Sequence, residues 1–285
     1  MEYRTLIDVD SLRALLDQAS VVVLDCRFNL ADPGAGRAAY LAGHIPAARF
    51  ADLDADLSSP VTPTSGRHPL PDPTLLAQRL ASWGIDADTQ VVVYDDMGGA
   101  MAARAWWLLR WLGHESVALL DGGLPAWQQA GLPLEQSEPE PEARFFDMRL
   151  RFNAVLDSES VAARQQAGEG LLVDARAPER YRGEVEPIDP VAGHVPGALN
   201  RPLNLNLDDN GRFKPAAQLA EEWRALIGAT EPSALVMMCG SGVTACHNLL
   251  ALEHAGLSGA RLYAGSWSEW IRDPARPVAT GDESA

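Results

Sequence analysis

The same series of short motifs occurs twice along the chain. The matches pair residues 21–27 with 171–176, 42–48 with 192–198, 92–95 with 237–239, and 122–127 with 265–270. The first pair is an apolar run that ends in Asp-x-Arg, and the second contains Gly-His-Ile/Val-Pro. Because the matches keep their order and nearly one offset, they indicate a duplicated domain rather than chance similarity.

Within each half, short runs of Val, Leu and Ile alternate with stretches of helical character. The clearest predicted helices are residues 11–19, 100–112 and 216–227. This alternation predicts an α/β fold with two tandem domains, each a parallel sheet with helices on both faces. Ligands of such sheets bind beyond the carboxyl ends of the strands.

A linker is expected between the two halves. Residues 134–143 are acidic, contain two prolines and show no periodicity, as is typical of an extended connection. We therefore predict a first domain at 1–134, an acidic linker at 135–150 and a second domain at 151–285.

Composition narrows the classes of partner. The 285 residues are 47% hydrophobic, which is enough for two packed cores, and the formal charge is −16 with a single lysine. Nucleic acid and anionic membranes repel such a surface, so neither is an expected partner. No signal peptide or membrane span is recognisable, and the three cysteines lack metal-ligand spacing. We expect a cytoplasmic protein with free thiols, no metal and no cofactor.

Cys239 is the strongest candidate for chemistry. It follows the apolar run at residues 235–238 and precedes a predicted helix at 244–255, with Gly240, Ser241 and Gly242 directly after it. Backbone amides at such a turn lack helical partners and stabilise an anion, which favours the nucleophilic thiolate. The alternative is a small buried apolar residue. The glycines and neighbouring hydroxyls favour the chemical interpretation.

Asp95 stands where Cys239 would be expected in the first half. An aspartate at the end of the matching strand offers no thiol. Any sulfur chemistry is therefore predicted to belong to the second half.

The motifs together resemble the two-domain sulfurtransferases of the rhodanese superfamily. The resemblance extends from about Asp8 to Trp270 and is carried by the loop at 239–246, by Gly-Ser-Trp-Ser-Glu-Trp at 265–270 and by both Gly-His-Ile/Val-Pro motifs. It implies two rhodanese-like domains, of which only the second holds the reactive cysteine.

The residues after the cysteine distinguish two groups in that family. Thiosulfate-preferring members resemble Cys-Arg-Lys-Gly-Val-Thr, whereas mercaptopyruvate-preferring members resemble Cys-Gly-Ser/Thr-Gly-Val-Thr, the pattern found here. The resemblance implies that Cys239 takes sulfur from 3-mercaptopyruvate as a persulfide, releases pyruvate, and passes the sulfur to an acceptor thiol, such as thioredoxin or a small thiol, or to cyanide. The loop residues Gly240, Gly242, Val243 and Thr244 are then expected to hold the charged sulfur and the substrate.

A proton relay is implied by the same resemblance. Ser241 matches its hydroxyl, His68 matches its histidine, and Asp54 matches its carboxylate. The spacing from Asp54 to His68 is longer than in relatives, so Asp52 is an alternative third member.

Arg180 matches the arginine that binds the substrate carboxylate. A planar guanidinium suits a carboxylate because it donates two parallel hydrogen bonds. The family usually carries a second arginine shortly afterwards, but residues 184–190 contain none. Arg182 is a candidate substitute, and thiosulfate remains the alternative donor.

Two rival functions are weighed against this one. A cysteine phosphatase needs Cys-x5-Arg, but Ala245 occupies the arginine position. A non-enzymatic binding module of the same fold is disfavoured because the second half keeps both the cysteine and its loop. Cys26, Cys246, His44 and His194 are interpreted as structural.

Overall fold

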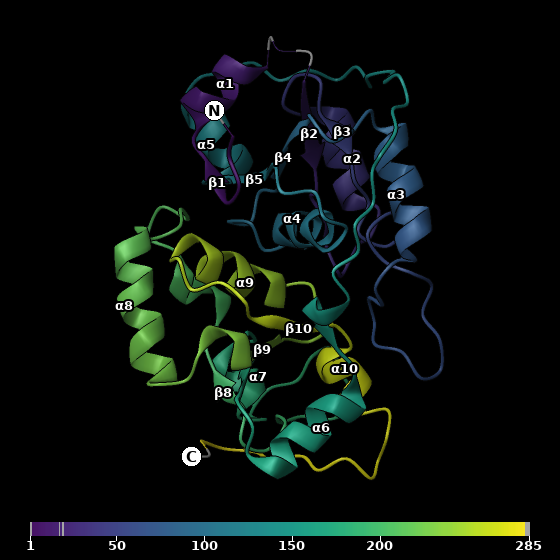
Figure 1. Ribbon diagram of the computed structural model, residues 1–285. Helices are drawn as coiled ribbons and strands as arrows, with labels where there is room; N and C mark the ends of the chain where they lie inside the picture. Colours follow the sequence, from purple (N-terminus) through teal and green to yellow (C-terminus); the bar gives the residue numbers. More distant parts are fainter. Residues whose placement is uncertain (1, 17, 19, 283–285) are drawn as a thin grey trace. The chain divides into compact units, whose positions relative to one another are not determined.

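The computed structural model describes residues 2–16, 18 and 20–282, which form two compact units (Figure 1). The first unit takes in the chain up to Ser59, Leu70–Arg151 and Asp208–Phe213. The second takes in Pro60–Pro69, Phe152–Leu207 and the chain from Lys214 onward. Residues 60–69 thus pack with the second unit although they precede most of the first in sequence.

A parallel sheet forms the centre of the first unit. Its strands, within the described residues, are β1 (Leu6–Ile7), β2 (Val21–Asp25), β3 (Arg49–Phe50), β4 (Gln90–Tyr94) and β5 (Val117–Leu120), in the spatial order β1-β5-β4-β2-β3. The central strands are buried runs of Val and Leu, as expected for a parallel sheet covered on both faces.

Helices cover this sheet. They are α1 (Val9–Leu15), α2 (Ala35–Ala42), α3 (Pro73–Ser82), α4 (Ala102–Trp111) and α5 (Gly123–Gln129). Leu12 of α1 and Trp127 of α5 belong to one apolar core with Val92 of β4, whereas α4 packs against β4 and β5. The predicted helix at 11–19 corresponds to α1, which begins earlier because Asp8 caps it through the amide of Ser11 at 2.8 Å; residues 17 and 19 lie outside the described residues.

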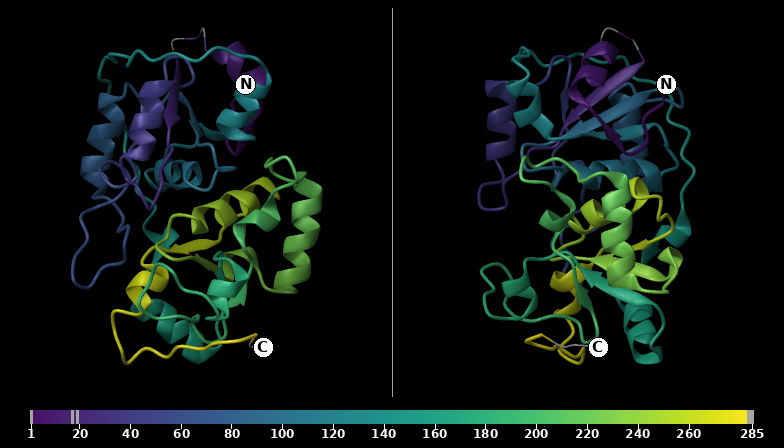
Figure 2. Two further views of the ribbon diagram at one scale, coloured as in Figure 1. Left: turned by 180° about the vertical axis from the view of Figure 1, so that it is seen from behind. Right: turned by 90° about the vertical axis from the view of Figure 1, so that its left-hand side faces the viewer.

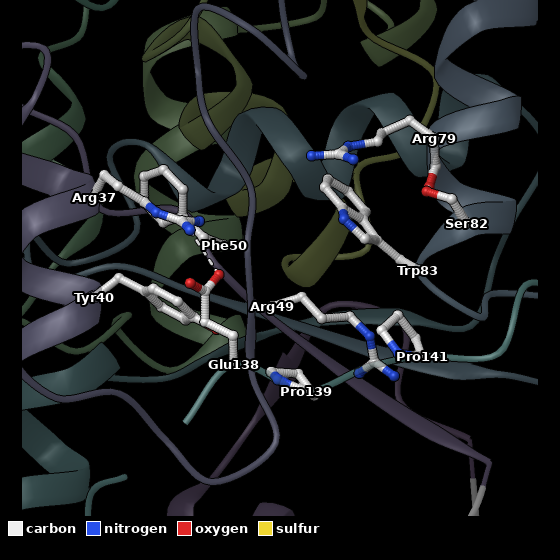
Figure 3. Close-up of a pocket in the computed structure, with 10 residues that line it drawn as sticks. All are labelled: Arg37, Tyr40, Arg49, Phe50, Arg79, Ser82, Trp83, Glu138, Pro139 and Pro141. Carbon is white, nitrogen blue, oxygen red and sulfur yellow. Dashed lines mark hydrogen bonds and ion pairs between the residues drawn. The ribbon is translucent and has the colours of Figure 1, made fainter. Parts of the chain in front are cut away.

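The acidic segment after residue 134 packs on the first unit (Figure 3). The amide of Glu135 donates to the carbonyl of His44 at 2.9 Å, and Glu138 pairs with Arg37 at 2.6 Å. Glu138 and two linker prolines line a cavity of about 230 Å³, whose other side holds Arg79 stacked over Trp83. A backbone hydrogen bond and an ion pair therefore hold this stretch of the chain in place.

The second unit repeats the architecture. Its strands, within the described residues, are β6 (Val155–Leu156), β7 (Leu171–Asp174), β8 (Leu199–Asn200), β9 (Leu235–Met238) and β10 (Arg261–Tyr263), all parallel in the order β6-β10-β9-β7-β8. The two orders become identical when the first set of strand numbers is raised by five. The predicted α/β fold of two duplicated parallel sheets is confirmed.

Helices cover both faces of the sheet in the second unit. They are α6 (Ser158–Ala167), α7 (Pro178–Tyr181), α8 (Ala216–Ile227), α9 (Ala245–His254) and α10 (Ser266–Trp270), with short 3-10 helices at Phe152–Ala154, Leu203–Asn206 and Pro232–Ala234. Trp267 and Trp270 of α10 pack with Val236 and Met238 of β9. On the other face, α9 packs against β9 and β10, and α8 lies alongside α9 (Figure 2).

Matching Tyr–His stacks mark an insertion in the second unit. Tyr40 stacks on His44 at 3.9 Å between ring centroids, and Tyr181 stacks on His194 at 3.8 Å. Each histidine Nδ1 lies 2.8 Å from the carbonyl of its tyrosine, but the two residues are 4 apart in the first half and 13 apart in the second. The additional residues form the stretch after α7, which contributes charged groups to the site.

Candidate active site

The Cys239 thiol lies at the carboxyl end of β9, between β10 and β7 in the sheet. It is 1% exposed, and the amide of Gly242 donates to its Sγ at 3.2 Å. The amides of Ser241, Val243 and Thr244 donate no hydrogen bond to any described residue. The loop therefore places one amide on the sulfur and leaves others free for an anion at this position.

The first turn of α10 anchors the reactive loop. Ser266 Oγ accepts from the amide of Cys239 at 3.0 Å and donates to the carbonyl of Tyr263 at 2.9 Å. The carbonyl of Cys239 accepts from the amide of Trp267 at 3.0 Å. Ser266 has a φ of 54°, a conformation that is costly for a residue other than glycine, so the anchor is held against backbone strain.

Two glycines of the loop have different structural requirements. Gly242 has a φ of 78°, and a Cβ there would lie 2.3 Å from the carbonyl oxygen of Ala264. Gly240 has no positive φ, and the three nearest atoms to a Cβ there are guanidinium nitrogens, at 3.2 Å in Arg67 and at 3.7 Å in Arg180. Gly242 is required by the backbone, whereas Gly240 leaves a space facing two arginines.

Residues 60–69 bring a histidine to the loop. His68 Nδ1 lies 2.7 Å from Ser241 Oγ, and these residues are 5% and 6% exposed. Two of the predicted relay members are therefore hydrogen-bonded next to Cys239. The third predicted member, Asp54, belongs to the first unit, as does Asp52, whose side chain accepts from the amides of Asp54 and Ala55 at 2.8 and 3.0 Å.

Arg180 lies in a network of buried charges. It donates to Glu186 through Nε and Nη2 and to Asp189 through Nη2 at 3.2 Å. Burial opposes ionisation of Glu186, but the hydrogen bonds from Arg180 and from loop amides lower its pKa below the ordinary value. Asp189 also accepts from Arg67 Nη1 at 2.5 Å. Residues 184–190, which contain no arginine, thus supply two carboxylates that bind Arg180 and Arg67.

Arg182, the predicted substitute, has a different environment. It forms two hydrogen bonds with Glu184, at 2.8 and 2.9 Å, and Glu184 is itself exposed. Arg67 was not identified from the sequence as a substrate-binding residue. Its only sequence signal is its position between Gly66 and His68, in a loop without periodicity.

The equivalent position in the first unit holds a carboxylate. Asp95 accepts four backbone hydrogen bonds at 2.7–2.8 Å, from Met97, Gly99, Met101 and Ala102. Its side chain is buried, and burial raises the pKa of its carboxyl while the four amides oppose that shift. The fold therefore gathers four amides around an acidic side chain at this joint.

The other two cysteines are also buried free thiols. Cys246 Sγ donates to the carbonyl of Gly242 at 3.4 Å. Burial, followed by the charges of nearby aspartates, raises the pKa of Cys26 well above its ordinary value.

In the described part of the chain, no group of three or more His, Cys, Asp or Glu side chains is arranged to hold a metal ion. None of the helices described is long and apolar enough to cross a membrane.

Relatives of known class share this whole architecture. The sequence is 53% identical over 285 residues to a probable 3-mercaptopyruvate sulfurtransferase of Pseudomonas aeruginosa, covering 99% of this chain and 100% of the relative. It is 43% identical over 266 residues to a putative thiosulfate sulfurtransferase of Mycobacterium tuberculosis, with 92% and 91% covered. The crystal structure of the Escherichia coli 3-mercaptopyruvate sulfurtransferase superposes with a TM-score of 0.79 at 33% identity, covering 94% of this chain and 100% of that one.

Both halves match one family of domains. The rhodanese-like domain matches residues 8–130 and again residues 157–273. These two matches coincide with the two parallel sheets and confirm the tandem repeat that the motifs predicted. The chain belongs to the rhodanese family, with two rhodanese-like domains in tandem.

Proposed function

We propose that this protein is a sulfurtransferase that takes sulfur from 3-mercaptopyruvate and passes it to a thiol or to cyanide. The observation that carries the proposal is the environment of Cys239, whose sulfur accepts from the Gly242 amide beside free amides and the Ser241–His68 pair. The relatives named 3-mercaptopyruvate sulfurtransferases support it.

The first step is attack of the Cys239 thiolate on the sulfur of the donor. A new S–S bond forms, and the C–S bond breaks with its electron pair moving into the carbon skeleton, which gives the enolate of pyruvate. Free loop amides stabilise the negative outer sulfur of the persulfide. Ser241 follows Cys239 by two residues and contacts His68, and this pair supplies the route by which a proton reaches the enolate carbon.

The second step returns the enzyme to its thiolate form. A thiolate acceptor attacks the outer sulfur, the S–S bond breaks, and Cys239 leaves with the electron pair. Thioredoxin, a small thiol or cyanide are the proposed acceptors. A cytoplasmic location is proposed because three buried free cysteines suit a reducing compartment.

Thiosulfate is the second candidate donor. The putative thiosulfate sulfurtransferase among the relatives and the two guanidiniums beside Gly240 favour it, because cations suit a dianion. The loop itself carries no cation at Gly240 or Ser241, which is why mercaptopyruvate is preferred here.

One experiment tests the function and the nucleophile together. The protein is mixed with 3-mercaptopyruvate, pyruvate is measured, and peptide mass spectrometry locates the added sulfur. We expect pyruvate release and one extra sulfur on the Cys239 peptide, with both lost in Cys239→Ser. The proposal fails if the wild type releases no pyruvate, or if Cys239→Ser retains turnover with the sulfur on Cys26 or Cys246. If kcat/KM is higher for thiosulfate than for 3-mercaptopyruvate, thiosulfate is the preferred donor instead.

A further inference from the structure

Two guanidinium nitrogens without partners converge on the space above Gly240. Arg67 Nη2 lies 3.2 Å and Arg180 Nη1 lies 3.7 Å from the point where a Cβ of residue 240 would be. Neither nitrogen donates to a described residue, and neither is sealed from solvent. Two such donors next to the nucleophile form a site for an anion.

We propose that Arg67 is the second arginine that binds the anionic end of the sulfur donor, together with Arg180. For 3-mercaptopyruvate this anion is the carboxylate, and each guanidinium contributes an N–H to it. The inference rests on the function proposed above. Relatives usually carry the second arginine shortly after the first, but residues 184–190 contain none. Under this proposal, the segment 60–69 supplies it instead.

Arg67 is held at its backbone and at the end of its side chain. The preceding residue, Gly66, packs so closely that a Cβ there would lie 2.6 Å from the carbonyl oxygen of Gly265. The amide of Arg67 donates to Ser268 Oγ at 3.0 Å, and its Nη1 donates to Asp189 at 2.5 Å. Because Ser268 also donates its amide to the carbonyl of Gly240, one residue ties Arg67 to the reactive loop.

Asp189 acts as a positioning residue for both arginines. Its Oδ1 accepts from Arg67 and its Oδ2 accepts from Arg180, while the residue is 8% exposed. A carboxylate between two guanidiniums offsets their mutual repulsion, so both can face one anion. Each arginine keeps an outward nitrogen after this pairing.

Arg67 also borders a cavity of about 400 Å³, which is separate from the space above Gly240 in its lining residues. Arg67, Asp189 and Ser268 line it, together with apolar side chains that include Ile188 and Ile271. Arg272 also lines the cavity, but it forms no ion pair with a described residue, and none of the three atoms nearest to a Cβ at residue 240 belongs to it. It is therefore a matched control for Arg67.

The test separates binding from chemistry. Steady-state kinetics with 3-mercaptopyruvate are measured for the wild type and for Arg67→Met, Arg67→Lys and Arg272→Met. We expect Arg67→Met to raise KM at least tenfold with kcat within threefold, Arg67→Lys to recover part of the loss, and Arg272→Met to match the wild type. A second measurement uses pyruvate as a probe of carboxylate binding to Cys239→Ser by calorimetry, where adding Arg67→Met should weaken affinity by a similar factor.

Each outcome decides the inference. If KM of Arg67→Met stays within twofold of the wild type, or if the loss falls mainly on kcat, Arg67 does not bind the donor. An equal loss in Arg272→Met would show only a general charge effect and would also overturn the assignment. An inactive wild type would refute the proposed function instead, and the pyruvate calorimetry would still report on Arg67.

Discussion

Replacing Gly240 by alanine should block the anion site without disturbing the fold. The backbone of Gly240 has no positive φ, so alanine suits its conformation, and a Gly→Ala change at such a position alters stability by only about 1 kcal/mol. The added methyl group would lie 3.2 Å from Arg67 Nη2 and 3.7 Å from Arg180 nitrogens, in the space assigned to the donor carboxylate. The methyl group therefore competes with the substrate and not with the protein backbone.

The magnitude follows from the hydrogen bonds that the carboxylate loses. One hydrogen bond to a charged group contributes roughly 1.5–3 kcal/mol, and about 1.4 kcal/mol corresponds to tenfold in binding. We therefore expect KM for 3-mercaptopyruvate to rise about 10- to 100-fold in Gly240→Ala, with a smaller fall in kcat. Pyruvate release measures the kinetics, and differential scanning calorimetry should show a Tm within about 4 °C of the wild type, as a change of about 1 kcal/mol allows.

Gly242→Ala is the matched control, because we expect it to lower the Tm, whereas Gly240→Ala should mainly raise KM. The φ of 78° and the carbonyl of Ala264 at 2.3 Å make alanine strained there, at a cost of about 1–3 kcal/mol before any clash is relieved. This corresponds to a fall in Tm of roughly 2–12 °C. If Gly240→Ala keeps both the KM and the Tm of the wild type, the carboxylate does not bind above Gly240 and the reasoning is refuted.

Three further predictions concern other parts of the second unit. Arg180→Ala should raise KM for 3-mercaptopyruvate about 10- to 100-fold while Arg182→Ala leaves it unchanged, because the guanidinium of Arg180 faces Gly240 whereas that of Arg182 pairs with Glu184; kinetics of the two variants showing the opposite order would contradict this. His68→Gln should lower kcat more than it raises KM, since His68 contacts Ser241, and a change confined to KM in the same assay would argue against a role in proton transfer. Hydrogen bonds from Lys214, Arg201 and Gln218 outweigh burial and lower the pKa of Glu222 from 4.5 to about 2, so its stabilising effect is present above pH 4.5 and lost as pH falls toward 2. The Tm difference between wild type and Glu222→Gln should accordingly shrink over that range, and a constant difference would show that ionisation is not its source.

The repeated motifs predicted the fold well because each carries a local physical signal. An apolar run ending in Asp-x-Arg gave β2 and β7, where the aspartate and arginine pair within two residues, as Arg27 does with Asp25 at 2.6 Å. Helix 216–227 was predicted to its exact bounds, since its apolar residues recur at helical spacing. Such signals depend on neighbours in sequence and can be read without the structure.

The site was predicted only in part because its contacts join distant residues. Ser241 and His68 are 173 residues apart, and Arg67 and Asp189 are 122 apart. Resemblance to relatives pointed to His68 but assigned no role to Arg67, and no periodicity marks an arginine in a proline-rich loop. Asp189 carries no sequence signal either, because its contacts with Arg67 and Arg180 form only in the folded chain.

The two halves show how one joint of the fold serves either structure or chemistry. In the first unit, four amides donate to the Asp95 carboxyl group, so the protein itself supplies the group that these amides bind. In the second, one amide binds Cys239 Sγ and others remain unpaired, so the second unit is left with donors for an anion that arrives with the substrate. The longer side chain of aspartate accepts hydrogen bonds from the loop amides, whereas the shorter cysteine leaves some of these amides without a partner. An aspartate at this joint therefore makes the loop a structural element, whereas a cysteine leaves an anion-binding site, beside which the arginines gather around Gly240.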